Sequence, residues 1–119
     1  MDVYGHVNNA RILTLLEEAR VALFFVGARE AGLTTFESGI VIYRHEIDYL
    51  RPVDYGSKVR IEMWISEVRA SKFTVAYELF SGDQVACRAA SVCVPFNLAS
   101  GRPRRLSDEE REFLTPWQA

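Results

Sequence analysis

The sequence predicts an α+β fold in which one long helix is followed by a four-stranded antiparallel meander. Three features of the sequence point to it. Apolar residues recur at helical steps early in the chain, later segments alternate apolar with polar residues, and the links between those segments are too short for parallel crossovers. The chain has 119 residues without a repeat or linker, so we expect a single domain over residues 1–119.

The long helix is predicted from Asn8 to about Ala28. Its main apolar stripe follows steps of three and four residues and comprises Ile12, Leu16, Ala19, Leu23 and Val26. Further apolar residues lie outside this stripe, so other elements are expected to enclose the helix. Asn8 or Asn9 is a suitable N-cap, because Asn accepts hydrogen bonds from free backbone amides, and Gly27 or Gly32 suits the exit.

Four strands are predicted after the helix. They run from Ile40 to Pro52, from Lys58 to Glu67, from Phe73 to Leu79 and from Gln84 to Phe96. The second and third alternate cleanly, so each turns one face toward a core. The fourth is apolar on both faces, which indicates a central strand or one at an interface.

A short helix is predicted near the end of the chain. Ser107-Asp108-Glu109-Glu110 matches a capping box, in which Ser107 caps the helix and Glu110 lies three residues later. We expect this helix to end at about Leu114.

Composition excludes several functional classes. Sixteen acidic and fourteen basic residues give a net charge of -2, so no basic footprint for nucleic acid exists. The longest strongly apolar run, Val21–Val26, is far shorter than the roughly 20 residues of a membrane-spanning helix. No signal peptide opens the sequence, and a cytoplasmic location is expected.

Cofactor and metal signatures are absent from the sequence. It has no phosphate-binding loop, no dinucleotide fingerprint and no His/Cys cluster with metal-ligand spacing, so neither a cofactor nor a metal is expected. Cys87 and Cys93 lie six residues apart, which is about 20 Å along an extended strand. We therefore expect two reduced packing residues.

A polar cluster lies immediately before the long helix: Asp2-Val3-Tyr4-Gly5-His6-Val7-Asn8-Asn9. A helix N-terminus presents unpaired N–H groups and about half a positive charge, so it can polarise a carbonyl group or hold an oxyanion. Gly5 would allow close approach of a ligand, and the helix dipole would keep Asp2 ionised. These residues favour an acyl-transfer or hydrolysis site, although capping chemistry alone would use the same residue types.

The string from Asp2 to Ala10, followed by Glu17-Glu18-Ala19-Arg20, strongly resembles the opening of hotdog-fold acyl-CoA thioesterases of the 4-hydroxybenzoyl-CoA thioesterase type. The resemblance continues through Ile47-Asp48-Tyr49-Leu50-Arg51-Pro52-Val53 and on to about Leu98. It implies a long helix wrapped by an antiparallel sheet. It also implies hydrolysis of an acyl-CoA thioester to free acid and CoA.

The resemblance also implies site residues. The family's essential Asp falls on Asp2, and the amide that polarises the thioester carbonyl falls near Asn9, with Ala10 in the oxyanion environment. The rest of the string is expected to line the substrate pocket: Tyr4, Gly5, His6, Val7 and Asn8. Asp2 either attacks the thioester itself or deprotonates a water molecule, and the sequence does not choose.

Charged residues outside the string have weaker roles. Guanidinium groups pair well with phosphate, so three arginines are the main candidates for holding the CoA phosphates: Arg44, Arg51 and Arg60. The run Arg102-Pro103-Arg104-Arg105 is a further candidate, although a solvated tail would account for it equally well. His45 is expected at the surface or at an interface. Of Glu17 and Glu18, one could face the site, although a solvated or interface helix face is the simpler interpretation.

A homodimer is expected, often paired again into a tetramer in the resembling family. Trp64 and Phe80 interrupt the polar faces of their strands, and exposed aromatic residues on a sheet usually mark a subunit contact. In that family a strand of about 5–6 residues precedes the motif. None precedes it here, so we expect either a natural start upstream of Met1 or a protein that dispenses with that strand and is weakly active.

Two alternative functions stay open at this point. The thioester could be delivered by acyl carrier protein instead of CoA. The chain could also be a non-catalytic hotdog domain that binds acyl groups or forms oligomers.

Overall fold

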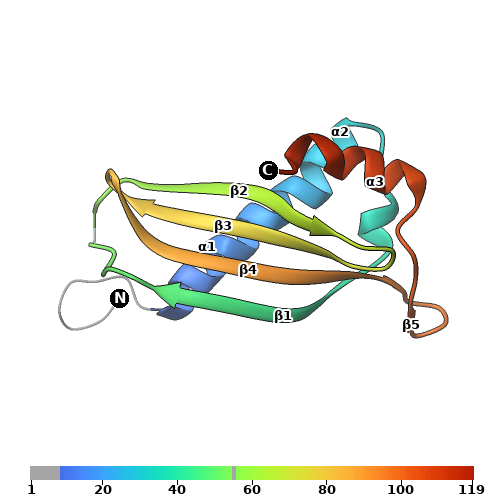
Figure 1. Cartoon of the computed structure of the whole chain (residues 1–119), viewed down its shortest axis with the longest axis horizontal. Helices are drawn as coiled ribbons and strands as arrows, with labels where there is room; N and C mark the ends of the chain where they lie inside the picture. Colours follow the sequence, from blue (N-terminus) through green and yellow to red (C-terminus); the bar gives the residue numbers. More distant parts are fainter. Residues whose placement is uncertain (1–8, 55) are drawn as a thin grey trace.

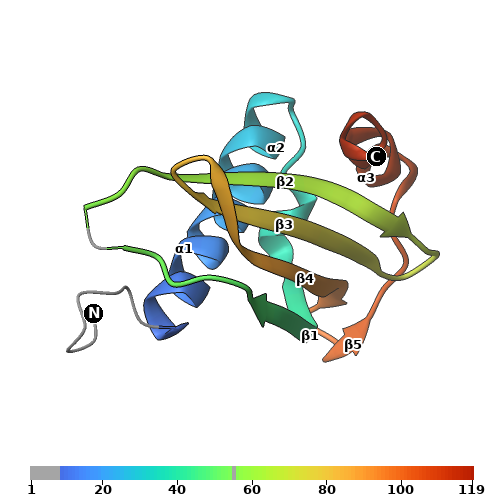
Figure 2. The same cartoon turned by 60° about the vertical axis from the view of Figure 1, so that its left-hand side comes forward.

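The computed structural model describes residues 9–54 and 56–119. A long helical segment crosses one face of a twisted antiparallel sheet obliquely, and a short helix lies near the far end of that segment (Figures 1 and 2). The helices are α1 Asn9–Val21, a π-helical segment Ala22–Gly27, α2 Ala28–Glu30 and α3 Asp108–Leu114, and 3-10 turns cover Thr35–Ser38 and Thr115–Trp117. The strands are β1 Ile40–Tyr49, β2 Val59–Val68, β3 Phe73–Ser81, β4 Gln84–Asn97 and β5 Arg102–Pro103.

The predicted long helix is present, but its apolar face changes phase partway along. Val26 was expected in the buried stripe and is instead 55% exposed, whereas Phe24 and Ala28 are buried. The π-helical turn causes this shift, because its wider spacing moves the packed face by one residue. Val21 is also exposed, so the other elements enclose the helix less completely than expected.

The exit from the helix lies at Gly32. Gly27 keeps helical dihedral angles, so it is not the stop. Gly32 has a φ of 84°, which glycine adopts without a steric penalty, and the next amide, of Leu33, donates to the carbonyl of Ala28 at 2.8 Å.

The sheet is fully antiparallel, and the predicted meander is confirmed for β2, β3 and β4 but wrong for β1. Its strand order is β1-β4-β3-β2, so consecutive strands β1 and β2 occupy opposite sides of the sheet. The link of residues 50–58 spans about 14 Å, which is three strand spacings. The prediction that the doubly apolar segment is central is confirmed, since β4 lies between β1 and β3.

The core lies between the helix and the inner face of the sheet. β3 contributes its alternate residues, all buried: Phe73, Val75, Tyr77 and Leu79. At the carboxyl-terminal end of the helix, Phe24, Phe36 and Phe73 form an aromatic cluster with ring centroids 5.2 to 5.8 Å apart. This cluster joins the π-helical turn, the following 3-10 turn and the sheet.

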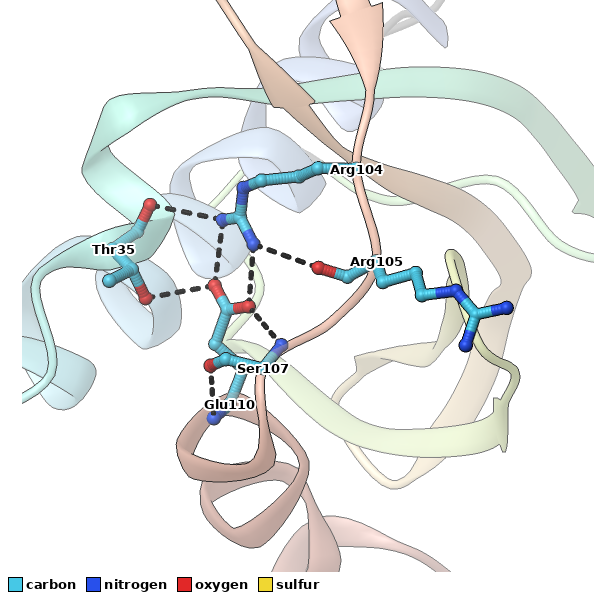
Figure 3. Close-up of polar contacts among 5 residues, drawn as sticks. All are labelled: Thr35, Arg104, Arg105, Ser107 and Glu110. Atoms are coloured by element: carbon cyan, nitrogen blue, oxygen red, sulfur yellow. Dashed lines mark hydrogen bonds and ion pairs between the residues drawn. The ribbon is translucent and has the colours of Figure 1, made fainter.

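Helix α3 is attached to the rest of the chain through buried Glu110 (Figure 3). The predicted capping box is confirmed, because the Glu110 amide donates to Ser107 Oγ at 3.1 Å and the Ser107 amide donates to Glu110 Oε1 at 2.8 Å. Arg104 donates to both carboxylate oxygens, at 2.7 and 2.8 Å. Thr35 Oγ1 donates to Oε2 at 2.9 Å. One carboxylate therefore connects α3, the strand β5 region and the turn after α2.

The ionised form of Glu110 is the stabilising one. Burial alone would raise the pKa of this carboxyl group, but hydrogen bonds from Arg104, Ser107 and Thr35 outweigh it and hold the pKa below its usual 4.5. The contribution to stability is therefore complete above pH 4.5 and is lost as the pH falls through the lower folded-state value.

We predict that Glu110→Gln lowers the free energy of unfolding at pH 7 by about 3 kcal/mol, because it leaves Arg104 without its buried partner. Thermal denaturation at pH 7 and pH 3 measures this, and the difference from wild type should narrow at pH 3. Glu112→Gln, a change on the same helix at a residue outside the buried set, is the control and should stay within about 0.5 kcal/mol of wild type. An equal deficit for Glu110→Gln at both pH values would contradict the charge-based account.

Candidate active site

The predicted catalytic carboxylate lies outside the described residues. Asp2 belongs to the segment 1–8, as do the expected pocket residues Tyr4, Gly5, His6, Val7 and Asn8. The structure does place the two residues expected to hold the oxyanion. Asn9 and Ala10 open α1, and both are exposed. Their catalytic role stays a prediction.

The first turn of α1 is suited to an anion or a polarised carbonyl oxygen. The first four N–H groups of any helix lack intrahelical acceptors, and the dipole adds partial positive charge there. No acidic side chain lies in this first turn, so none neutralises that charge from within the helix. Both views place the beginning of α1 near the carboxyl-terminal end of β1 (Figures 1 and 2).

The three candidate phosphate-binding arginines do not converge within one chain. Arg44 lies on β1 and forms an ion pair with Glu46. Arg60 lies on β2, at the other side of the sheet, 3.7 Å from Glu62 and with its guanidinium carbon 4.2 Å from the centre of the Phe80 ring.

Arg51 has a different setting from the other two. It donates to Gln84 Oε1 at 3.4 Å. With Leu50, Gln84, Val85 and Arg88, it lines an open groove of about 460 Å³. Two guanidinium groups therefore border this groove, and the residues directly after β1 form part of its lining.

A larger open groove, of about 750 Å³, lies away from the beginning of α1. It is bordered by the start of β1, the end of β4 and the turn between β2 and β3, and its lining includes Val41, Tyr43, Arg69, Lys72, Val94 and Phe96. Since α1 begins near the opposite end of β1, this groove is not part of the helix N-terminal site.

A polar network that the sequence did not predict connects the helix to the sheet. Arg20 on α1 donates to the hydroxyl of Tyr77 on β3 at 3.2 Å, and Tyr77 donates to Ser91 Oγ on β4 at 3.0 Å. Ser91 Oγ lies 2.7 Å from His45 Nδ1 on β1. The one sign of this network in the sequence was Ser91, a polar residue among the inward-facing residues of β4.

The charge state of His45 follows from this setting. Burial lowers the pKa of the imidazole below its usual 6.5, the positive charge of Arg20 lowers it further, and Glu17 partly opposes both. His45 is therefore neutral at pH 7. His45 was expected at the surface or at an interface. The residue is exposed, but its Nδ1 is hydrogen-bonded to the hydroxyl of buried Ser91.

The two thiols are unsuited to nucleophilic chemistry. Cys87 and Cys93 are free and buried, as expected for packing residues. Burial raises the pKa of Cys87 to about 11 and that of Cys93 to about 12. Thiolate is the reactive form, so both side chains are inert near neutral pH.

Two features are absent from the described residues. No group of three or more His, Cys, Asp or Glu side chains there could hold a metal ion. No helix in that part of the chain is long and apolar enough to cross a membrane.

Sequence comparison finds related proteins. Residues 1–114 match the family profile described as the thioesterase-like superfamily. The 1,4-dihydroxy-2-naphthoyl-CoA hydrolase of Gloeothece citriformis (strain PCC 7424) is 33% identical over 81 residues, which cover 66% of this chain and 57% of that protein. The alignment therefore spans a little over half the length of that relative.

Solved structures resemble the whole fold. A predicted thioesterase from Bacillus stearothermophilus has a TM-score of 0.88 at 28% identity, covering 99% of this chain and 87% of its own. A thioesterase from Thermus thermophilus, solved with coenzyme A and Zn, has a TM-score of 0.82 at 29% identity, covering 98% and 85%. These similarities confirm the hotdog fold that the resemblance implied.

The buried thiols give a direct test of the packing at the sheet. We predict that iodoacetamide at pH 8 leaves Cys87 and Cys93 unmodified in the folded protein and alkylates both in denaturant, because folding raises both pKa values and blocks access. Intact-mass spectrometry over time measures this. Rapid alkylation of either residue under native conditions would show that the inner face of β4 is open.

Proposed function

Because the chain belongs to the thioesterase-like superfamily, we propose that it hydrolyses an acyl-CoA thioester to the free acid and CoA, acting as one domain. The observation that supports this most directly is the exposed first turn of α1, directly after the Asp-containing string. A helix N-terminus supplies donors for a developing oxyanion without any side chain of its own. The similarity to a named CoA-ester hydrolase and to a thioesterase solved with coenzyme A favours CoA over acyl carrier protein as the thiol carrier.

In the proposed mechanism, the thioester carbonyl oxygen accepts hydrogen bonds from the amides of Asn9 and Ala10. Asp2 then attacks the carbonyl carbon, which gives a mixed anhydride and CoA thiolate, and water hydrolyses the anhydride. Alternatively, Asp2 takes a proton from water that attacks directly. Either route expels a thiolate whose conjugate acid has a pKa near 8.5, so little help from a general acid is needed.

Among the three arginines, Arg51 is the best placed for the CoA phosphates. It borders an open groove and follows the strand whose end lies near the beginning of α1. Arg88 borders the same groove but is paired with Glu78 at 3.0 Å. Arg44 and Arg60 pair with glutamates of their own strands, so a phosphate would have to displace those partners.

We also propose that the protein works in the cytoplasm as a homodimer or a dimer of dimers. β1 pairs with β4 along one side, and no residue of β1 is buried within the described chain. A second copy adding a strand to the open side of β1 would pair the backbone groups along that edge.

We predict that Asp2→Asn lowers kcat/KM for acyl-CoA hydrolysis by about 100-fold or more, because Asn neither attacks nor accepts a proton. Release of free CoA thiol measures the rate. The matched control is Asp83→Asn, an exposed Asp in the turn between β3 and β4, which should keep wild-type turnover. Wild-type turnover by Asp2→Asn would remove Asp2 from the mechanism.

A further inference from the structure

An uncovered strip lies on the helix side of the sheet, along β1. Alternate residues of β1 face the same side as the inward-facing residues of β4: Ile47 opposes Ala89, His45 opposes Ser91 and Tyr49 opposes Cys87. None of these β1 residues is fully buried, although Ile47 is half-buried against the core, so the helix covers this strip only in part. Its side chains are the imidazole of His45, the aliphatic chain of Ile47 and the phenol ring of Tyr49.

The polar network fixes which hydrogen His45 presents at this strip. A guanidinium group only donates, so Tyr77 accepts from Arg20 and sends its own hydrogen to Ser91. Ser91 is buried, and its hydroxyl bonds in the described chain are those to Tyr77 and His45, so its hydrogen is directed to His45 Nδ1. Neutral His45 then carries its proton on Nε2 as a donor.

The lengths of the strand and of the helix give similar separations between His45 and the beginning of α1. Tyr49, at the end of β1 near the start of α1, is four residues from His45, or about 13 Å along the strand. Glu17, whose charge acts on His45, is eight residues from Asn9, or about 12 Å along the helix. An acyl group whose carbonyl lies at Asn9 would therefore follow the strip and end beside His45 and Glu17.

We propose that His45 is a specificity-determining residue, which donates from Nε2 to an uncharged oxygen at the end of the acyl group remote from the thioester. The inference rests on the proposed hydrolysis of acyl-CoA. A hydroxyl group fits best, since its oxygen accepts from Nε2, whereas a plain hydrocarbon would cover this donor without supplying an acceptor. A terminal carboxylate would be attracted by Arg20 and repelled by Glu17, the two charges that act on His45. At roughly 1.2 Å per bond, as in an extended backbone, a chain of about ten carbons covers the distance.

The test compares decanoyl-CoA with 10-hydroxydecanoyl-CoA. We expect wild type to hydrolyse the hydroxylated ester with a kcat/KM about tenfold above that of decanoyl-CoA. His45→Phe should remove this preference, and His45→Gln, which keeps an N–H donor, should restore part of it. Glu46→Gln, next to His45 but on the opposite face of β1, should leave the preference unchanged.

Binding of the same esters to Asp2→Asn, measured by calorimetry, gives a readout separate from turnover. Should no ester be hydrolysed while the hydroxylated one binds more tightly through His45, the proposed hydrolysis fails and the recognition stands. Equal binding and equal turnover of the hydroxylated and plain esters by wild type would overturn the inference. So would an equal loss of both in His45→Phe, since that is the effect of a purely structural residue.

Discussion

Packing of the long helix against the inner face of the sheet is the interaction on which the other features depend. It buries the alternate residues of β3 together with Ile12, Leu16 and Phe24, and it covers β1 only in part. It also directs the first turn of α1 toward the end of β1 (Figures 1 and 2). The position of the helix therefore determines both proposed sites. Its first turn provides the proposed oxyanion site, and its side borders the proposed acyl strip along β1.

Local patterns predicted the elements but not all of their partners. The alternation from Val59 onward predicted β2 to within one residue, and the capping box predicted α3, because both signals lie in neighbouring residues. The short link between the first two predicted strands showed only that the chain reverses there, not which strand it meets, so β1 and β2 were wrongly made neighbours. Val26 was placed on the buried face because a π-helical turn leaves no mark in a pattern of three- and four-residue steps.

The candidate site was likewise predictable only where its signals are local in the sequence. The position of Asn9 and Ala10 at a helix start followed from the sequence, since caps and apolar spacing are local signals. The network of Arg20, Tyr77, Ser91 and His45 did not, because its members come from four elements and meet only when the sheet order is known. The string around Asp2 was informative for another reason: its resemblance to a known family carried information that residue types alone do not hold.

The π-helical turn has a consequence for how this chain accommodates changes of length. Leu23 and Ala28 are both buried although they lie five positions apart, where an ordinary helix would use four. The turn is thus equivalent to one inserted residue, absorbed without rotating the packed surface on either side. Irregular pairing near Tyr43 and Ser66 has the same effect in the strands, where one added residue would otherwise turn every later side chain over. The extra residue already present at each of these places leaves the interior of the molecule in register.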